Sequence, residues 1–365
     1  MIESGRISNI QAAMLAVMSL TIIGHLILLT VVIGESHQDG WIAAVIGTIL
    51  GLIGIISLVR LSQKFPGLTL IEILCSHFSW VGKLIGVLYL IYFYIMTVLA
   101  VRLFVEVCKK IMEETPMVAF AAVILFLTAY IVYSGIETVG RINQIILPVV
   151  VIIAFVVVVL TLGKNKDYSN LLPILGNGFS PVALGSLSVM GWFGEFVIMG
   201  MIFPYVQNPR KLVKTGIYAA LITLVFFLGP VTGPIAMFGP VEAAKMELPT
   251  FSEVRYITAG SVLYRFDTIA ILFWTTGLTI RTAMFFYGLS LGTAQAFKLK
   301  SYRPIVIPLA WLIGVGAILF VKNYQELTDF LFNTYVPLNL IMGVAIPLLL
   351  LLVSPFVVKK ISMGR

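Results

Sequence analysis

The sequence has little charge. Only 11% of its 365 residues are charged and 60% are hydrophobic, about half the charged share of a soluble domain. So few charges could not cover the surface of a soluble fold of this length. The net charge is +8, but Lys and Arg gather at the ends of apolar segments, which is typical of membrane proteins. We therefore expect a lipid bilayer as the surroundings and no nucleic acid as a partner.

The apolar segments lack the alternation of polar and apolar residues that a membrane barrel strand needs. The run Ile145–Leu162 is continuously apolar, and blocks of twenty or more such residues match a hydrocarbon core of about 30 Å. Backbone polar groups in lipid must be paired within the protein. The fold class predicted is an all-α membrane protein.

Motifs for catalysis and metal binding are also missing. Cys75 and Cys108 are the two cysteines; they are expected near opposite membrane faces, which excludes a disulfide between them. His25, His37 and His77 are scattered, and no metal spacing, nucleophile elbow or phosphate loop is present. The sequence predicts neither an enzyme nor a cofactor or metal site. Met1–Ile10 leads into a full-length span with no small-residue cleavage site, so no cleavable signal peptide is expected.

Ten apolar segments are predicted to cross the membrane, in one domain, residues 1–365, made of two five-helix repeats, residues 1–165 and 166–365. The spans are residues 10–33, 41–60, 83–107, 117–134, 139–162, 182–206, 213–237, 267–296, 304–321 and 328–354. Gly67–Phe78 is amphipathic and too short to span, so it is expected at the interface. The long loop Gly239–Phe266 contains LPTFSEVRYI, which predicts a short helix.

The distribution of positive residues predicts that both termini are cytoplasmic. With the N-terminus inside, fourteen positives fall inside: Arg6, Arg60, Lys64, Lys83, Arg141, Arg210, Lys211, Lys214, Lys298, Lys300, Arg303, Lys359, Lys360 and Arg365. Eight fall outside: Lys109, Lys110, Lys164, Lys166, Lys245, Arg255, Arg265 and Lys322. An even number of spans then places Lys359 and Lys360 on the same side as Arg6.

Two spans contain a glycine-bearing polar patch at mid-depth. Span 1 has Ser19–His25, and span 6 has Gly191–Glu195. In transporters built from inverted repeats, such patches mark broken helices whose free backbone groups face a ligand. Glycines that serve close helix packing are the alternative.

Four ionisable residues lie within spans, where each costs a few kcal/mol (about 2.5–3.5 kcal/mol on insertion scales). Arg102 and Glu106 are four apart on span 3, so we expect a structural ion pair. Glu195 can be protonated, pair with Arg281, or face a wet cavity and carry protons. Arg281 in span 8 needs a carboxylate, which Glu195 or a ligand could supply. Tyr92 in span 3 is a candidate pocket residue, although aromatics at helical spacing are more often packing residues.

The order of several motifs resembles the B subunits of nutrient germinant receptors, the spore germination membrane proteins of endospore-forming bacteria. Besides Arg102 and Glu106, the matching stretches are Gln38–Trp41, Lys64–Leu74, Leu171–Pro181, Leu248–Ile257 and Tyr264–Trp274. Relatives often carry more glycine in span 1, where this sequence has Ile22 and Ile23 before Gly24 and His25 after it.

This resemblance implies a leucine-transporter-like fold with broken helices 1 and 6. It also implies a receptor in the spore inner membrane, formed with an A subunit and a lipoprotein C subunit. The germinant, commonly an amino acid, would occupy a central pocket and trigger germination; its expected contacts are Thr21, Ile22, Ile23, Gly24, Tyr92, Gly194, Glu195, Arg281 and Phe285. The residues alone suit equally an autonomous proton-coupled amino-acid transporter with Glu195 as the proton carrier.

Overall fold

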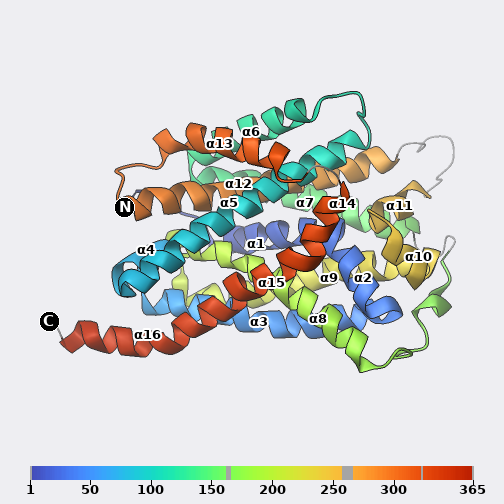
Figure 1. Cartoon of the computed structure of the whole chain (residues 1–365), viewed down its shortest axis with the longest axis horizontal. Helices are drawn as coiled ribbons and strands as arrows, with labels where there is room; N and C mark the ends of the chain where they lie inside the picture. Colours follow the sequence, from blue (N-terminus) through green and yellow to red (C-terminus); the bar gives the residue numbers. More distant parts are fainter. Residues whose placement is uncertain (1, 162–165, 257–265, 322–323, 364–365) are drawn as a thin grey trace.

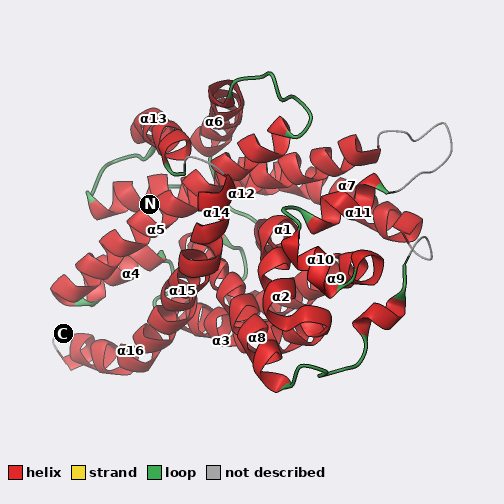
Figure 2. Cartoon of the chain, turned by 45° about the vertical axis from the view of Figure 1, so that its right-hand side comes forward, coloured by secondary structure: helices red, strands yellow, loops and turns green. Residues whose placement is uncertain are grey.

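The computed structural model describes residues 2–161, 166–256, 266–321 and 324–363, and these form helices and connecting loops (Figures 1 and 2). The helices run along the long axis of the molecule, with the N-terminus, α4 and the C-terminal end of α16 at one end and α10 and α11 at the other (Figure 1). The only extended pairing among the described residues is an isolated parallel bridge between Ile7 and Val206.

The first half of the chain supplies five passes. They are α1 (Asn9–Ile23) continued by the π-helix η1 (Gly24–Leu28) and α2 (Leu29–Ser36), then α3 (Gly40–Lys64), α5 (Ser79–Lys109), α6 (Met117–Ser134) and α7 (Ile136–Thr161). The 3-10 turn η2 (His37–Asp39) precedes α3, and α4 (Leu70–His77) precedes α5. The short helix expected within Gly67–Phe78 is therefore present. Thr69 caps it, since its hydroxyl accepts from the backbone N–H of Glu72.

The second half supplies five more. They are α8 (Phe179–Phe193) continued by the 3-10 helix η4 (Gly194–Met201), then α9 (Leu212–Phe238), α12 (Phe266–Ala296), α13 (Arg303–Leu319), and a last pass of α14 (Tyr324–Phe330), η7 (Leu331–Tyr335), α15 (Val336–Asn339), η8 (Leu340–Ala345) and α16 (Ile346–Met363). Short elements connect them: η3 (Tyr168–Leu171), η5 (Phe203–Tyr205), η6 (Pro209–Lys211), α10 (Pro240–Lys245) and α11 (Pro249–Arg255). The helix expected in LPTFSEVRYI is α11.

Each predicted span corresponds to a helical pass in the described chain. Eight helical segments are long and apolar enough to cross a membrane, one of which joins α2 to α3. The other two passes are α12, which has 31 residues, and α13, which has 17. Of the positive residues counted in the sequence, Lys164, Arg265, Lys322 and Arg365 lie outside the described residues, as does the beginning of the Tyr264–Trp274 stretch.

Two groups of passes surround the centre of the molecule. One group contains α1, α3, α8 and α9, which pack on one another, and the other contains α5, α6, α12 and α13. The groups meet where α1 and η4 contact α12. Close approach requires glycine at this level: a Cβ on Gly194 would meet the backbone of Asn339, and one on Gly343 would meet Gly194 in turn. This crossing brings the last pass against span 6 beside Glu195.

Candidate functional site in the centre of the helix bundle

The centre contains a buried ion pair between span 6 and span 8. The guanidinium of Arg281 on α12 donates to the carboxylate of Glu195 on η4, and both side chains are 0% exposed. Arg281 also lies over the ring of Phe285, 4.7 Å from the ring centre, and its second nitrogen is 3.5 Å from the carbonyl oxygen of Met96. Of the alternatives left open for Glu195, the structure has the pair with Arg281.

A chain of hydrogen bonds extends from this pair to the last pass and to span 3. The Tyr335 hydroxyl donates to Glu195 Oε1 over 2.7 Å. Asn339, one turn later, donates from Nδ2 to the Tyr335 carbonyl and accepts from the Tyr92 hydroxyl over 2.5 Å. Tyr92 is therefore linked to Glu195 through two residues of the last pass.

The pair is not fully satisfied. Within the described part of the chain, Glu195 Oε2 and Arg281 Nε have no hydrogen-bond partner. The same holds for the hydroxyls of Ser19 and Thr21 on α1 and of Thr282 on α12. Buried polar atoms without partners are costly, about 1–3 kcal/mol each, so the two free atoms of the pair are available to a ligand.

The helix type changes at both glycine positions singled out in the sequence. At Gly24 span 1 passes from α to π winding, and at Gly194 span 6 passes from α to 3-10 winding. Neither segment is unwound: the Gly24 N–H still contacts the carbonyls of Leu20 and Thr21. The expectation of bare backbone groups at Thr21–Gly24 is therefore wrong, because the wider π turn keeps the chain hydrogen-bonded and Trp192 Nε1 donates to the Leu20 carbonyl over 3.0 Å.

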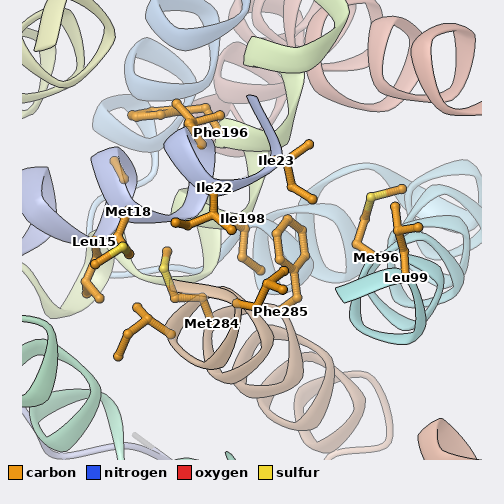
Figure 3. Close-up of a cluster of buried hydrophobic side chains, with 14 of the residues drawn as sticks. Leu15, Met18, Ile22, Ile23, Met96, Leu99, Phe196, Ile198, Met284 and Phe285 are labelled. Atoms are coloured by element: carbon orange, nitrogen blue, oxygen red, sulfur yellow. The ribbon is translucent and has the colours of Figure 1, made fainter. Parts of the chain in front are cut away.

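Apolar side chains fill the space beside the pair. Ile22 and Ile23 of α1, Ile198 of η4, and Met284 and Phe285 of α12 converge in the centre (Figure 3). The expected contact residues Thr21, Ile22, Ile23, Tyr92, Gly194, Glu195, Arg281 and Phe285 are all buried, as is Gly24. All nine residues therefore lie in the interior of the bundle, in a closed arrangement.

The other expected ion pair is also present, away from the centre. Arg102 and Glu106 are joined along α5 at 2.8 Å, and Arg102 Nη1 donates to the carbonyl oxygen of Val321 over 2.9 Å. Cys75 and Cys108 are free.

At the end that carries α11, a cavity of about 490 Å³ lies between α7, α9, α11 and α12 and reaches His25 of η1. The helix α11 lies over it: the Thr250 hydroxyl donates to the His25 carbonyl over 3.3 Å, and Glu253 pairs with Lys166 at 2.8 Å. Burial raises the pKa of the Glu253 carboxyl above its usual value, and Lys166 acts in the opposite direction. The Glu253 carboxylate lies against Gly233, where a Cβ would come within 2.6 Å of it.

At the opposite end, the N-terminal segment closes the bundle. The buried Glu3 carboxylate accepts from the backbone N–H of Gly5 over 2.7 Å, from that of Ile136 over 3.3 Å, and from the hydroxyl of Tyr302 over 2.9 Å. Ile7 then pairs with the end of span 6: its N–H donates to the Tyr205 carbonyl, and the Gln207 N–H donates to its carbonyl. The bridge fastens the start of span 1 to the end of span 6.

Sequence reasoning missed five residues of these networks. Asn339 and Tyr335 were detectable, since an amide in the apolar last span needs a buried partner. Glu3 lies in a short polar terminus, and Glu253 and Lys166 lie in loops, so nothing in their local sequence distinguishes them from solvated charges.

The described fold and its buried charges define the class: an integral, multi-pass, all-helical membrane protein with a transporter-like fold. The structure superposes on that of MhsT in complex with L-phenylalanine with a TM-score of 0.67 and 15% identity, covering 92% of this chain and 88% of that one. Residues 6–326 match the family model described as spore germination protein, and the chain belongs to that family. Relatives include spore germination protein YndE of Bacillus subtilis (strain 168), 27% identical over 96% of this chain and 97% of the relative. Spore germination protein XB of Bacillus anthracis is 28% identical over 96% and 98%.

These comparisons confirm the family resemblance and the fold class. They agree with the prediction that the chain is not an enzyme.

Proposed function

We propose that this chain is the B subunit of a nutrient germinant receptor and that it binds a zwitterion, an amino acid, between spans 1, 3, 6 and 8. The observation that carries the proposal is the fully buried pair of Glu195 and Arg281 with one unpartnered atom on each side. The Glu195 carboxylate can bind an ammonium group and the Arg281 guanidinium can bind a carboxylate. Glu195 lies next to Gly194, where span 6 changes its helix type. MhsT, which has a similar fold, was solved with an amino acid bound.

The pair acts as an internal substitute for the ligand. An amino acid would offer its ammonium to Glu195 and its carboxylate to Arg281, which suits bidentate contact. Two ion pairs with the ligand then replace the one between Glu195 and Arg281. Neither buried charge is left without a partner, and the cost of an unpaired buried charge, about 3–5 kcal/mol, is avoided. The side chain of the ligand would displace the apolar contacts of Ile22 and Phe285.

Binding selects a different arrangement of the bundle from the closed one. The central charges are 0% exposed here, so the ligand must bind an opened state more tightly, and only that difference in affinity shifts the population. Tyr335 and Asn339 connect the pair to the last pass. Separation of Glu195 from Arg281 would therefore move the last pass relative to span 3.

Membership of the spore germination protein family supports a receptor setting. We propose that the end carrying both termini is cytoplasmic, in line with the bias of positive residues, and that α10 and α11 lie on the outer side of the spore inner membrane. The A subunit and the lipoprotein C subunit are the partners to which the shift of the last pass would be transmitted.

The test begins with a thermal-shift screen of the purified, detergent-solubilised chain against the amino acids, since a ligand that selects the folded state raises its melting temperature. The amino acid that shifts it is then compared with its amide, which lacks the carboxylate. The wild-type chain should prefer the acid by tenfold or more, and Arg281→Gln should abolish that preference. Arg281→Lys, which keeps the charge, should retain part of it.

Arg102→Gln is the matched control, because it removes an arginine from the other Arg–Glu pair within a span. If it changes acid-over-amide preference as much as Arg281→Gln does, Arg281 has no place in the site. The alternative is tested by uptake of the amino acid into proteoliposomes that contain only this chain. Uptake that is driven by a proton gradient and lost in Glu195→Gln would show that the chain is an autonomous proton-coupled transporter and not a receptor subunit.

A further inference from the structure

A pocket of about 390 Å³ lies at the end that carries both termini, between the last turn of α3 and the start of α9. Arg60 of α3, Arg210 of η6 and Pro204 are among the residues that line it. Both arginines are exposed. Arg60 lies near the end of span 2 and Arg210 just before span 7, so the fold brings them to one pocket.

The pocket offers positive charge without an internal counter-charge. No carboxylate in the described part of the chain pairs with Arg60 or Arg210. Glu72, nearby in sequence, accepts from the backbone N–H of Thr69 over 2.9 Å, and Glu137 pairs with Arg141. Lys211 and Lys214 follow Arg210 and add to the positive charge.

Two carbonyls of the pocket lining already accept hydrogen bonds. Gln63 Nε2 donates to the Pro209 carbonyl over 3.0 Å, and Arg6 Nη1 donates to the Pro204 carbonyl over 3.4 Å. The charged groups of the lining are the two guanidinium groups, whose planar forks match phosphate oxygens. The chemistry of the pocket is therefore that of a phosphate-bearing anion.

Each of the two helices presents a stripe of exposed apolar side chains that ends in positive residues. On α3 the exposed Ile49 and Ile53 lie on the helix face that leads to Arg60, and on α9 the exposed Tyr218 and Val225 lie on the face that leads back to Lys214 and Lys211, which follow Arg210. An acyl chain lying along either stripe would place its headgroup in the pocket. We propose that this pocket binds the phosphate headgroup of an anionic phospholipid.

The bound headgroup would act on the N-terminal closure. The pocket wall at Phe203 and Pro204 continues into Tyr205 and Val206, which pair with Ile7. A phosphate held by both arginines ties α3 to the start of α9 and holds this wall in place. Lipid composition would thereby set how firmly that end of the bundle is closed, whichever germinant the central site takes.

Native mass spectrometry of the purified chain with phosphatidylglycerol, phosphatidylcholine or inorganic phosphate tests the proposal. Arg60→Gln with Arg210→Gln should weaken phosphatidylglycerol binding tenfold or more. The control, Lys83→Gln with Lys300→Gln, removes the same charge from exposed residues of the same end outside the pocket and should change it less than twofold. Arg60→Lys with Arg210→Lys should fall between the two, because charge is kept and the fork is lost.

Equal binding by the arginine variant and the control overturns the site. Phosphatidylcholine binding as tight as that of phosphatidylglycerol also overturns the site, because the pocket would then not select the anionic headgroup over the zwitterionic one. Inorganic phosphate tests whether the bound phosphate belongs to a lipid headgroup or is free phosphate. If phosphate raises the melting temperature of the chain as much as phosphatidylglycerol does, the assignment to a lipid is overturned. Competition of millimolar phosphate with a tighter lipid supports it.

Discussion

The two ends of the bundle are closed by different kinds of contact. At the end with the termini, Glu3 accepts from donors on its own segment, on α7, on α12 and in the loop before α13, and Ile7 adds two backbone hydrogen bonds to span 6. At the α11 end, a helix of seven residues is held by the Lys166–Glu253 ion pair, by the hydroxyls of Thr250 and Thr161, and by the buried Phe251 and Val254. The first closure is a network of hydrogen bonds from several elements, and the second combines one ion pair with apolar packing.

This difference indicates which end opens first. Releasing the N-terminal segment breaks several hydrogen bonds at once, including those to a carboxylate, which are worth about 1.5–3 kcal/mol each. Releasing α11 separates the Lys166–Glu253 pair, whose members can be rehydrated on leaving the cavity, and exposes Phe251 and Val254. For the ligand that we propose for the central site, this difference favours entry past α11 while the other end stays closed, since alternating access requires one end to be closed.

The largest effect is expected from Glu3→Ala. The substitution leaves the Tyr302 hydroxyl and the Ile136 N–H without an acceptor, so we expect a loss of about 4 kcal/mol in the closure of that end. Hydrogen exchange of residues 2–8 and thermal unfolding of the purified chain measure it. The control is Glu72→Ala, which removes a carboxylate at the same end that only caps α4, worth about 1 kcal/mol. Equal loss of protection at residues 2–8 in the two variants would mean that Glu3 does not hold the segment.

A smaller effect is expected from Lys166→Ala at the other end. It leaves Glu253 unpaired, but the carboxyl can take up a proton, because burial already raises its pKa. We therefore expect a loss of about 2 kcal/mol in the docking of α11, less than the 3–5 kcal/mol typical of a broken buried pair. Hydrogen exchange of the α11 amides measures the docking.

A double-mutant cycle tests whether the pair is the cause. Adding Glu253→Gln to Lys166→Ala should restore part of the protection, since no buried charge then remains. The control Lys245→Ala breaks the exposed pair with Glu242 and should leave α11 unchanged, as exposed pairs contribute about 0–1 kcal/mol. Additive effects of the two substitutions in the cycle would show that Lys166 and Glu253 act independently.

The central site could be predicted further than either closure could. Ionisable residues in apolar runs are conspicuous, so Glu195, Arg281 and the Arg102–Glu106 pair were identifiable, and the order of the spans follows from their length. The change of helix type at Gly24 and Gly194 could not be predicted, because a glycine in a membrane helix permits an unwound turn, a π turn or close packing alike. At Gly24 the choice depends on Trp192, which lies against it and donates to Leu20.

The closures were unpredictable for a physical reason. Glu3 and Glu253 become buried only through contacts made by distant parts of the chain: Tyr302 for the first, Lys166 and Gly233 for the second. In sequence each resembles a charge exposed to water. Local pattern therefore located the groups that lipid makes costly and did not reveal those that tertiary packing takes out of water.

The smallest effect is that of pH on the docking of α11. Burial raises the pKa of Glu253 in the docked state above the value it has when α11 is released, so the docked state binds the proton more tightly. Docking is then strongest below the ordinary carboxyl pKa and weakens as pH rises through the raised pKa, after which it stays constant. Hydrogen-exchange protection of α11, corrected for the intrinsic rate at each pH, should fall over that interval, and Glu253→Gln should remove the dependence. The Glu3 closure provides the internal comparison: a parallel fall at residues 2–8 in the same samples would trace the effect to general loosening of the bundle, since α11 and the N-terminus lie at opposite ends of the molecule (Figure 1).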